Sequence, residues 1–330
     1  MKKASVKNDS DDTDANAKKK KNRLAIVDHE KCKPKKCNKE CVMKCPVNAG
    51  GKQCVTVNDI EDIGLKASIA VGLCIGCGLC IKACPFKAIN IVNLPAELSD
   101  DKILVSYGPN SFRVFMAPHI KKNYCIGIIG SNGLGKTTII DVLSGNNKIN
   151  IVDKKKLLAG SEMFAYLSQL AENKITVSYK PQNISYYNRK EKGAGLTKVS
   201  KILNKIPLDV QAEMNLTKLS DRLLYQLSGG ETQRLLIAHA YSKKADSYLF
   251  DEPTAFLDIK QRICASNLIQ KIGNAYVILI EHDLCIFDYT TDYVMSLYGE
   301  KGAYGVISSI SSTYNGINNY LAGYLSIVHW

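Results

Sequence analysis

Nine of the 12 cysteines in this chain of 330 residues lie between positions 32 and 84. Eight of them form two runs of four that each end in Cys-Pro: Cys32-x4-Cys37-x3-Cys41-x3-Cys45 and Cys74-x2-Cys77-x2-Cys80-x3-Cys84. Short spacings let several thiols of one loop face the same point, and Gly76 and Gly78 allow the second loop to turn that tightly. So small a segment has little apolar core, and its fold must depend on what its cysteines bind.

Iron–sulfur clusters explain both runs. In two-cluster ferredoxins, each [4Fe-4S] cluster is held by three cysteines of one run and by the cysteine before proline of the other run. We therefore expect one cluster on Cys74, Cys77, Cys80 and Cys45, and the other on Cys32, Cys37, Cys41 and Cys84. Cys54 is left over and is expected to be a free buried thiol.

The flanking sequence predicts a small ferredoxin-like α+β domain at residues 23–98. Apolar, β-rich runs at residues 24–27 and 88–92 stand just before and just after the cysteine runs, and we expect them to pair as strands. The clusters should hold this domain folded, so their loss should unfold it.

Zinc and disulfides are the alternatives for these cysteines. Zinc ribbons usually pair two Cys-x2-Cys knuckles, which gives no role to a cysteine before proline in each run. Disulfides belong to oxidising compartments, whereas this chain shows no signal peptide and carries ATPase motifs typical of the reducing cytosol. Both alternatives are therefore weaker than iron–sulfur binding.

Charge points to a polyanionic partner. The chain has 44 Lys and Arg against 31 Asp and Glu, a formal net charge of +13, which two clusters with their thiolates would lower to about +9. RNA would suit such a surface, and a solvated lysine-rich face is the alternative. Positive charge gathers in a tail at residues 1–22, expected to be disordered, and at residues 180–205. No stretch reaches the ~18 apolar residues of a membrane span, so no direct membrane insertion is expected.

A phosphate-binding loop follows a strand-like apolar run at residues 124–129. The sequence from Gly130 to Thr137 is a complete G-x4-G-K-T motif, whose backbone N–H groups surround phosphates at a helix N-terminus. The residues expected to bind ATP here are Gly130, Asn132, Gly133, Gly135, Lys136, Thr137 and Thr138. Lys136 would place a positive charge on the phosphates, and the Thr137 hydroxyl would ligate Mg²⁺.

Two carboxylates end a second strand-like run at residues 247–251. Asp251 would hold Mg²⁺ through water, and Glu252 would act as the base that orients or deprotonates the attacking water. His282 ends another such run, at residues 276–280, and would reach the γ-phosphate. An ordinary histidine at a strand end is the alternative for His282.

The sequence Leu-Ser-Gly-Gly-Glu at residues 227–231 distinguishes ATP-binding cassettes from other P-loop proteins. Ser228, Gly229 and Gly230 open a second helix N-terminus, which in cassette proteins receives the nucleotide of a facing cassette. Gln182 fits the loop that senses Mg²⁺, and residues 256–258 fit the loop that crosses the pair. We predict an α/β P-loop nucleotide-binding domain of the ABC type at residues 99–330. For adenine stacking we expect Tyr107 or Phe112, either of which could instead be a core residue.

The combination resembles one family, the RNase L inhibitors, which form the E subfamily of ABC ATPases and recycle ribosomes. The residues that carry the resemblance are CKPKKC at 32–37, CIGCG at 74–78, CPFKAI at 84–89, NLP at 93–95, YGPNSF at 107–112, SGGE at 228–231 and EHDL at 281–284. The resemblance implies ATP, Mg²⁺ and two [4Fe-4S] clusters that act structurally. It also implies splitting of ribosomes after termination or rescue, and a role in translation initiation. The cassette motifs predict a cytoplasmic location, and the lysine run at residues 18–21 is the basis for expecting a nuclear or RNA-contacting segment as well. The implied partners are the small ribosomal subunit and its RNA, a release factor or its rescue paralogue, and initiation factors.

The chain departs from that family in three places. Family members carry a hinge and a second cassette, whereas this sequence ends just past the first, so we expect a second cassette in cis that is missing here or one supplied in trans. Thr232 stands where the family has leucine, and residues 183–195 match poorly.

Three other functions remain open. The chain could be a nucleotide-binding module without full ATPase activity, because a single cassette lacks a facing signature. An ATP-driven redox protein would use the clusters as electron carriers, but the sequence shows no flavin or NAD site. The ATPase subunit of a transporter would share every cassette motif but has no use for the cysteine module.

Overall fold

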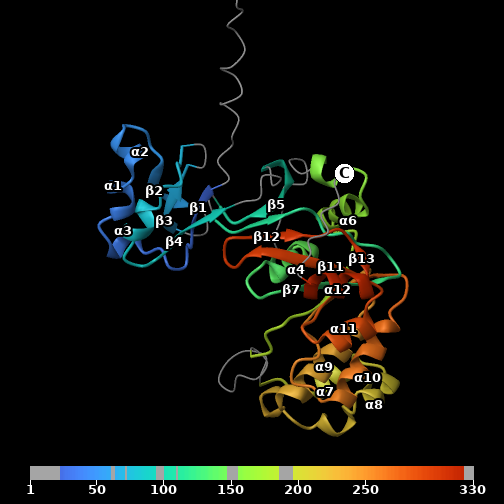
Figure 1. Ribbon diagram of the computed structural model, residues 1–330. Helices are drawn as coiled ribbons and strands as arrows, with labels where there is room; N and C mark the ends of the chain where they lie inside the picture. The colour runs from blue at the N-terminus through green and yellow to red at the C-terminus, as the bar shows by residue number, and fades with distance from the viewer. Residues whose placement is uncertain are drawn as a thin grey trace, which may run out of the picture. The chain divides into compact units, whose positions relative to one another are not determined.

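The computed structural model describes residues 23–60, 64–70, 73–93, 100–108, 111–146, 155–185 and 196–322. The predicted tail and part of the basic stretch at residues 180–205 lie outside these ranges. The chain divides into two compact units, Met1–Ser99 with Tyr107–Phe112, and Asp100–Ser106 with Arg113–Trp330 (Figure 1). The sequence predicted a single domain boundary between residues 98 and 99. The structure differs in one respect, because the segment Tyr107–Phe112 belongs to the first unit although residues 100–106 before it belong to the second.

The first unit is an α+β module built on two small antiparallel sheets. Its elements are β1 (Arg23–Val27), α1 (Glu40–Met43), α2 (Pro46–Ala49), β2 (Val55–Ile60), β3 (Gly64–Ile69), α3 (Leu79–Ala83) and β4 (Ile89–Asn93). Strand β1 pairs with β4, with Ala25 opposite Ile91, so the two runs that flank the cysteines meet as the sequence predicted. Strands β2 and β3 form a hairpin of their own.

The second unit is organised around a nine-stranded sheet. Its strands are β5 (Ile103–Ser106), β6 (Arg113–Phe115), β7 (Cys125–Gly130), β8 (Val177–Lys180), β9 (Ser247–Asp251), β10 (Tyr276–Ile280), β11 (Tyr293–Glu300), β12 (Tyr304–Ile307) and β13 (Ser311–Ser312). Along the sheet, β7 lies between β11 and β10, followed by β9 and β8, and all of these pairs are parallel. Parallel order brings the carboxyl ends of β7, β9 and β10 to one edge, where an α/β sheet binds its ligands.

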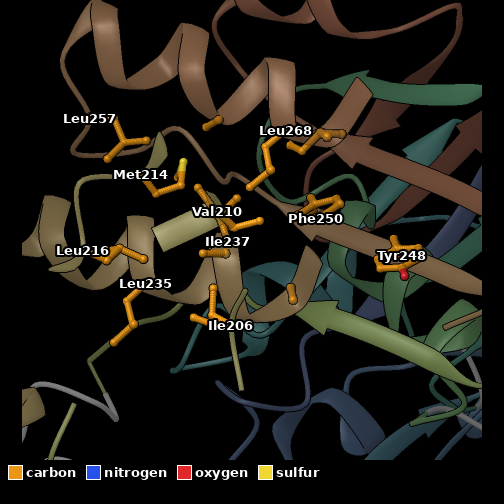
Figure 2. Close-up of a cluster of buried hydrophobic side chains, with 14 of the residues drawn as sticks. Ile206, Val210, Met214, Leu216, Leu235, Ile237, Tyr248, Phe250, Leu257 and Leu268 are labelled. Atoms are coloured by element: carbon orange, nitrogen blue, oxygen red, sulfur yellow. The ribbon is translucent and has the colours of Figure 1, made fainter. Parts of the chain in front are cut away.

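Some helices of the second unit pack on this sheet, and others gather in a group at one end of the unit. They are α4 (Lys136–Ser144), α5 (Lys155–Leu158), α6 (Glu162–Ala171), α7 (Ser200–Leu203), α8 (Leu208–Glu213), α9 (Gly229–Ser242), α10 (Ile259–Gln270), α11 (Leu284–Thr290) and α12 (Thr313–Ala322). Helices α7, α8, α9 and α10 gather together (Figure 1), and their apolar side chains close on β9 in one core that includes Leu235, Leu268 and Phe250 (Figure 2). This core fixes the start of α9 relative to the end of β9.

Candidate nucleotide site and cysteine cavities

The phosphate-binding loop connects β7 to α4, as the sequence predicted. Gly133 and Gly135 have φ values of +82° and +101°, which glycine adopts without strain, and Gly135 caps α4. A Cβ on Gly130 would lie 2.8 Å from the Leu297 Cβ, so the loop needs glycine there to pass β11. The Thr137 side chain is exposed in the first turn of α4.

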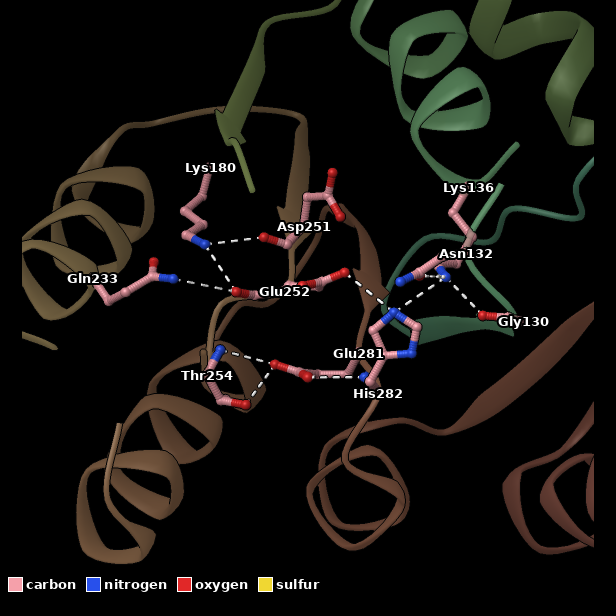
Figure 3. A network of polar contacts seen from close by, with 10 residues as sticks. All are labelled: Gly130, Asn132, Lys136, Lys180, Gln233, Asp251, Glu252, Thr254, Glu281 and His282. Atoms are coloured by element: carbon pink, nitrogen blue, oxygen red, sulfur yellow. Dashed lines mark hydrogen bonds and ion pairs between the residues drawn. The ribbon is translucent and has the colours of Figure 1, made fainter. Parts of the chain in front are cut away.

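Lys136 is buried, and its ammonium group lies inside the loop. It donates to the Gly130 carbonyl at 2.6 Å and to Asn132 Oδ1 at 3.1 Å (Figure 3). Burial lowers the pKa of Lys136, against the opposing effect of the Glu252 and Asp251 carboxylates. The loop therefore holds its lysine with acceptors that a phosphate could replace.

Glu252 and His282 meet beside Lys136. The His282 Nε2 atom lies 3.2 Å from Glu252 Oε1 and 3.2 Å from Lys136 Nζ. Glu252 has a left-handed backbone, with φ of +44°, directly after β9. The three residues predicted to act in catalysis are thus brought together from the start of α4 and from the ends of β9 and β10 (Figure 3).

Asp251 is almost fully buried, and its Oδ2 atom has no hydrogen-bond partner among the described residues. Burial and the neighbouring Glu252 carboxylate raise the pKa of Asp251 to about 6. A buried carboxylate oxygen without a hydrogen-bond donor lowers the stability of the fold unless a cation or a proton binds to it.

The signature sequence begins α9 with a reciprocal capping box. Ser228 Oγ accepts from the Glu231 amide at 3.2 Å, and the Glu231 carboxylate accepts from the Ser228 amide at 2.8 Å. The glycines are required by the neighbouring loop, because a Cβ on Gly230 would lie 2.9 Å from the Phe256 carbonyl oxygen. Thr232, the departure from the family pattern, is buried and donates its hydroxyl to the Ser228 carbonyl at 3.0 Å.

Other predicted residues lie outside this hydrogen-bonded group. Gln182 is exposed two residues after the end of β8, and it is not one of the residues that form the polar network drawn in Figure 3. Tyr107 is 40% exposed, with its ring centroid 6.5 Å from that of Phe112, and both belong to the first unit. Their roles stay predictions.

Sequence reasoning missed two buried charged residues at the site. Lys180 ends β8 and donates to the carbonyls of Asp251 and Glu252, and burial lowers its pKa to about 8. Glu281 accepts from the Thr254 amide at 2.8 Å and from the His282 amide at 3.0 Å. The charge of Lys180 at the end of a buried strand, and the pair Glu281-His282, were the available signals.

The cysteines of the first unit line two separate small cavities. The first is lined by Cys32, Cys37, Cys41 and Cys84, and the second by Cys45, Cys54, Cys74, Cys77 and Cys80. Burial raises the pKa of Cys41 and Cys80 to about 11. Cys54 is buried as expected, and burial together with Cys45 and Cys74 raises its pKa to about 12.

Comparison with known families agrees with both units. The model described as "Possible Fer4-like domain in RNase L inhibitor, RLI" matches residues 23–53, the one described as "4Fe-4S binding domain" matches 68–90, and the one described as "ABC transporter" matches 116–255. Arabidopsis thaliana "ABC transporter E family member 3" is 38% identical over 155 residues, which are 44% of this chain and 76% of that protein. The chain belongs to the E family of ABC proteins.

Longer E-family relatives match nearly the whole chain. The "Translation initiation factor rli1" of Schizosaccharomyces pombe is 40% identical over 92% of this chain and 53% of its own length. A solved structure described as "Model of ribosome-bound archaeal Pelota and ABCE1" superposes with a TM-score of 0.80 at 36% identity, over 93% of this chain and 54% of that one. This E-family chain therefore spans about half the length of those relatives.

The family assignment and the fold predicted from the sequence are confirmed. The E-family chain carries an iron–sulfur type of domain and an ABC type of nucleotide-binding domain. In the part of the chain that the structure describes, no helix has the length and apolar character that a membrane crossing requires.

Proposed function

We propose that this protein binds and hydrolyses ATP to act on ribosomes, splitting or releasing subunits after termination or rescue and serving translation initiation. The observation that carries the proposal is the joint presence, in one chain, of the E-family cysteine module and an assembled Lys136, Glu252 and His282 group. The relatives named for translation initiation, and the structure named for Pelota and the ribosome, support the same role.

Each of the three residues has a distinct task in hydrolysis. Lys136 would exchange the Gly130 carbonyl and Asn132 for phosphate oxygens. Glu252 would accept a proton from the attacking water or orient it, and His282 would contact the terminal phosphate from the other side. The backbone N–H groups at the start of α4 add a fixed positive potential.

The residues present fit a magnesium ion. The orphaned Asp251 Oδ2 atom is a buried hard oxygen donor, and Mg²⁺ prefers such ligands. Thr137 would supply a hydroxyl ligand, and Gln182 is the third predicted ligand. The ion would neutralise the charge that develops on the phosphates.

The cysteine cavities fit two [4Fe-4S] clusters. They are similar in size, they lie in an apolar core, and each contains one complete predicted ligand set. Among the described residues, no three histidine, cysteine or acidic side chains converge closely enough for a single metal ion. Bound clusters would supply structural support for the module.

A second cassette, in cis or in trans, would complete the site. Ser228 caps α9 as an acceptor, and its own hydroxyl proton can be donated to a phosphate held by a facing cassette. Without a facing cassette we expect ATP binding with slow turnover. The small subunit with its RNA, a release factor or its rescue paralogue, and initiation factors are the expected partners, in the cytoplasm.

Ribosome co-sedimentation tests the proposal. Anaerobically purified protein is incubated with small subunits and a non-hydrolysable ATP analogue, alongside the double variant Cys77→Ser, Cys80→Ser and the control Cys264→Ser on α10. We expect sedimentation of the wild type and the control only, and only with nucleotide. Failure of the cluster-loaded wild type to sediment would contradict the proposal.

A further inference from the structure

Three elements converge on the main chain of Glu252. The Lys180 ammonium group lies 3.0 Å from the Glu252 carbonyl oxygen and 2.9 Å from the Asp251 carbonyl oxygen. The Gln233 amide group donates to the same Glu252 oxygen at 3.4 Å, and the Glu252 N–H donates to the Ile280 carbonyl at 2.9 Å. Figure 3 shows Lys180 and Gln233 reaching Glu252 from β8 and α9.

Packing does not require a lysine at this position. Lys180 is only 1% exposed, and burying an ammonium group costs free energy that an apolar side chain of similar length would avoid. What lysine supplies is a pair of N–H donors for two carbonyls, and a positive charge beneath Asp251, Glu252 and Glu281. The contacts therefore act on the segment that carries the carboxylates of Asp251 and Glu252.

The Glu252 backbone needs such support. Its φ of +44° lies in the left-handed region, which costs a non-glycine residue about 1 kcal/mol or more. The Glu252 side chain must keep this backbone to stay 3.2 Å from His282 Nε2. If the carbonyl were released, the peptide could rotate and the carboxylate would leave the histidine.

We propose that Lys180 is a positioning residue that holds the general base Glu252, and that Gln233 joins it in tying this base to the signature helix. Lys180 stands two residues before Gln182, and Gln233 lies on the helix that Ser228 begins. A displacement of either segment is transmitted to the carbonyl of Glu252. The kinetic part of this inference rests on the proposed ATPase function, whereas the geometric part does not.

Hydrogen exchange measures the positioning without any hydrolysis. The full chain is compared with Lys180→Met, which keeps the length and removes the donors, with Lys180→Arg, which keeps them, and with Lys174→Met, an exposed lysine before β8. We expect the Glu252 amide to exchange at least ~10-fold faster in Lys180→Met, because its local opening is easier. Exchange of the β7 amides should stay unchanged in every variant, which separates a local effect from unfolding.

Kinetics at matched protein concentration give the second measurement. A small misplacement of a catalytic group lowers turnover about 10- to 100-fold, so kcat should fall by that factor in Lys180→Met while the Kd for MgATP stays within about threefold. Lys180→Arg should restore part of kcat. Gln233→Leu should show the same pattern more weakly, and it serves if Lys180→Met does not fold.

Unchanged exchange at Glu252 in a folded Lys180→Met variant would overturn the inference. Equal losses of kcat and nucleotide affinity would do so as well, since they would indicate general damage. If the wild type binds ATP and does not hydrolyse it at any protein concentration, the proposed ATPase function fails. The exchange result then still decides the role of Lys180.

Discussion

The two units of this chain have interiors of different composition. Among the described residues, the buried core of the cysteine module has twelve members, and five of these are cysteines. One core of the cassette unit contains Leu216, Leu235, Leu268 and Phe250 among many aliphatic side chains, and Cys125 is the one buried cysteine among its described members (Figure 2). We expect the module to depend on the clusters that its cysteines would bind, and the cassette to depend mainly on apolar packing.

Removal of the clusters should produce the largest difference in stability between the two units. Anaerobic chelation of iron should unfold the module completely and leave the cassette folded, because in small metal-binding domains the free energy of metal binding is also free energy of folding. Limited proteolysis followed by mass spectrometry measures this, with cleavage expected within residues 23–93 and protection of residues 113–322. Cys264→Ser, a half-buried cysteine of the cassette, should retain iron, and protection of the module after chelation would contradict the comparison.

A cavity created in the cassette core should destabilise the cassette and leave the module folded. Leu268 is 1% exposed, and its replacement by alanine should lower the free energy of unfolding of the cassette by about 2–5 kcal/mol. Urea unfolding followed by circular dichroism gives this value, and the visible absorption of the clusters reports on the module. Leu208→Ala is the matched control because Leu208 is 78% exposed. Loss of cluster absorption in Leu268→Ala would show that the two interiors are coupled.

The half-buried His239 should make the cassette weakly sensitive to acid. Burial, with Lys243 and Lys205 nearby, lowers the pKa of His239 to about 4 from 6.5. The unfolded chain binds this proton first, so stability present above pH 6.5 is lost as pH falls towards 4. One pKa unit corresponds to about 1.4 kcal/mol, and after allowance for partial exposure we expect about 1–2 kcal/mol.

His239→Gln should flatten that pH dependence. Urea unfolding of both proteins between pH 4 and 7 tests this, with the module monitored separately by its cluster absorption. Parallel stability curves for the two proteins would show that His239 does not contribute.

Local sequence patterns predicted the parts of the site that lie on short contiguous segments. The loop from Gly130 to Thr137, the strand that ends at Asp251 and the helix that begins after Ser228 all form as expected. Each has a chemical signature within about ten residues, such as a glycine at positive φ or a serine cap. The pairing of β1 with β4 was also predictable, because both strands flank the cysteine runs.

Contacts between distant segments were not predictable in the same way. Lys180 looks like one of many surface lysines in a basic stretch, and its burial depends on carbonyls about 70 positions away. The place of Glu281 in the site likewise depends on the hydrogen bonds that it accepts from Thr254, which is 27 positions away. The β2–β3 hairpin was missed because its alternating pattern lies between the two cysteine runs.

The position of His282 has a consequence for the protons at the site. Its Nε2 atom faces an ammonium group on one side and a carboxylate on the other, each at 3.2 Å. One imidazole nitrogen either offers a lone pair to Lys136 or a proton to Glu252, and it cannot do both at once. If a phosphate drew Lys136 away, Nε2 would be left with the Glu252 carboxylate as its neighbour and could carry the hydrogen. Phosphate binding in the loop at residues 130–137 would thereby determine which nitrogen of the His282 ring carries the hydrogen.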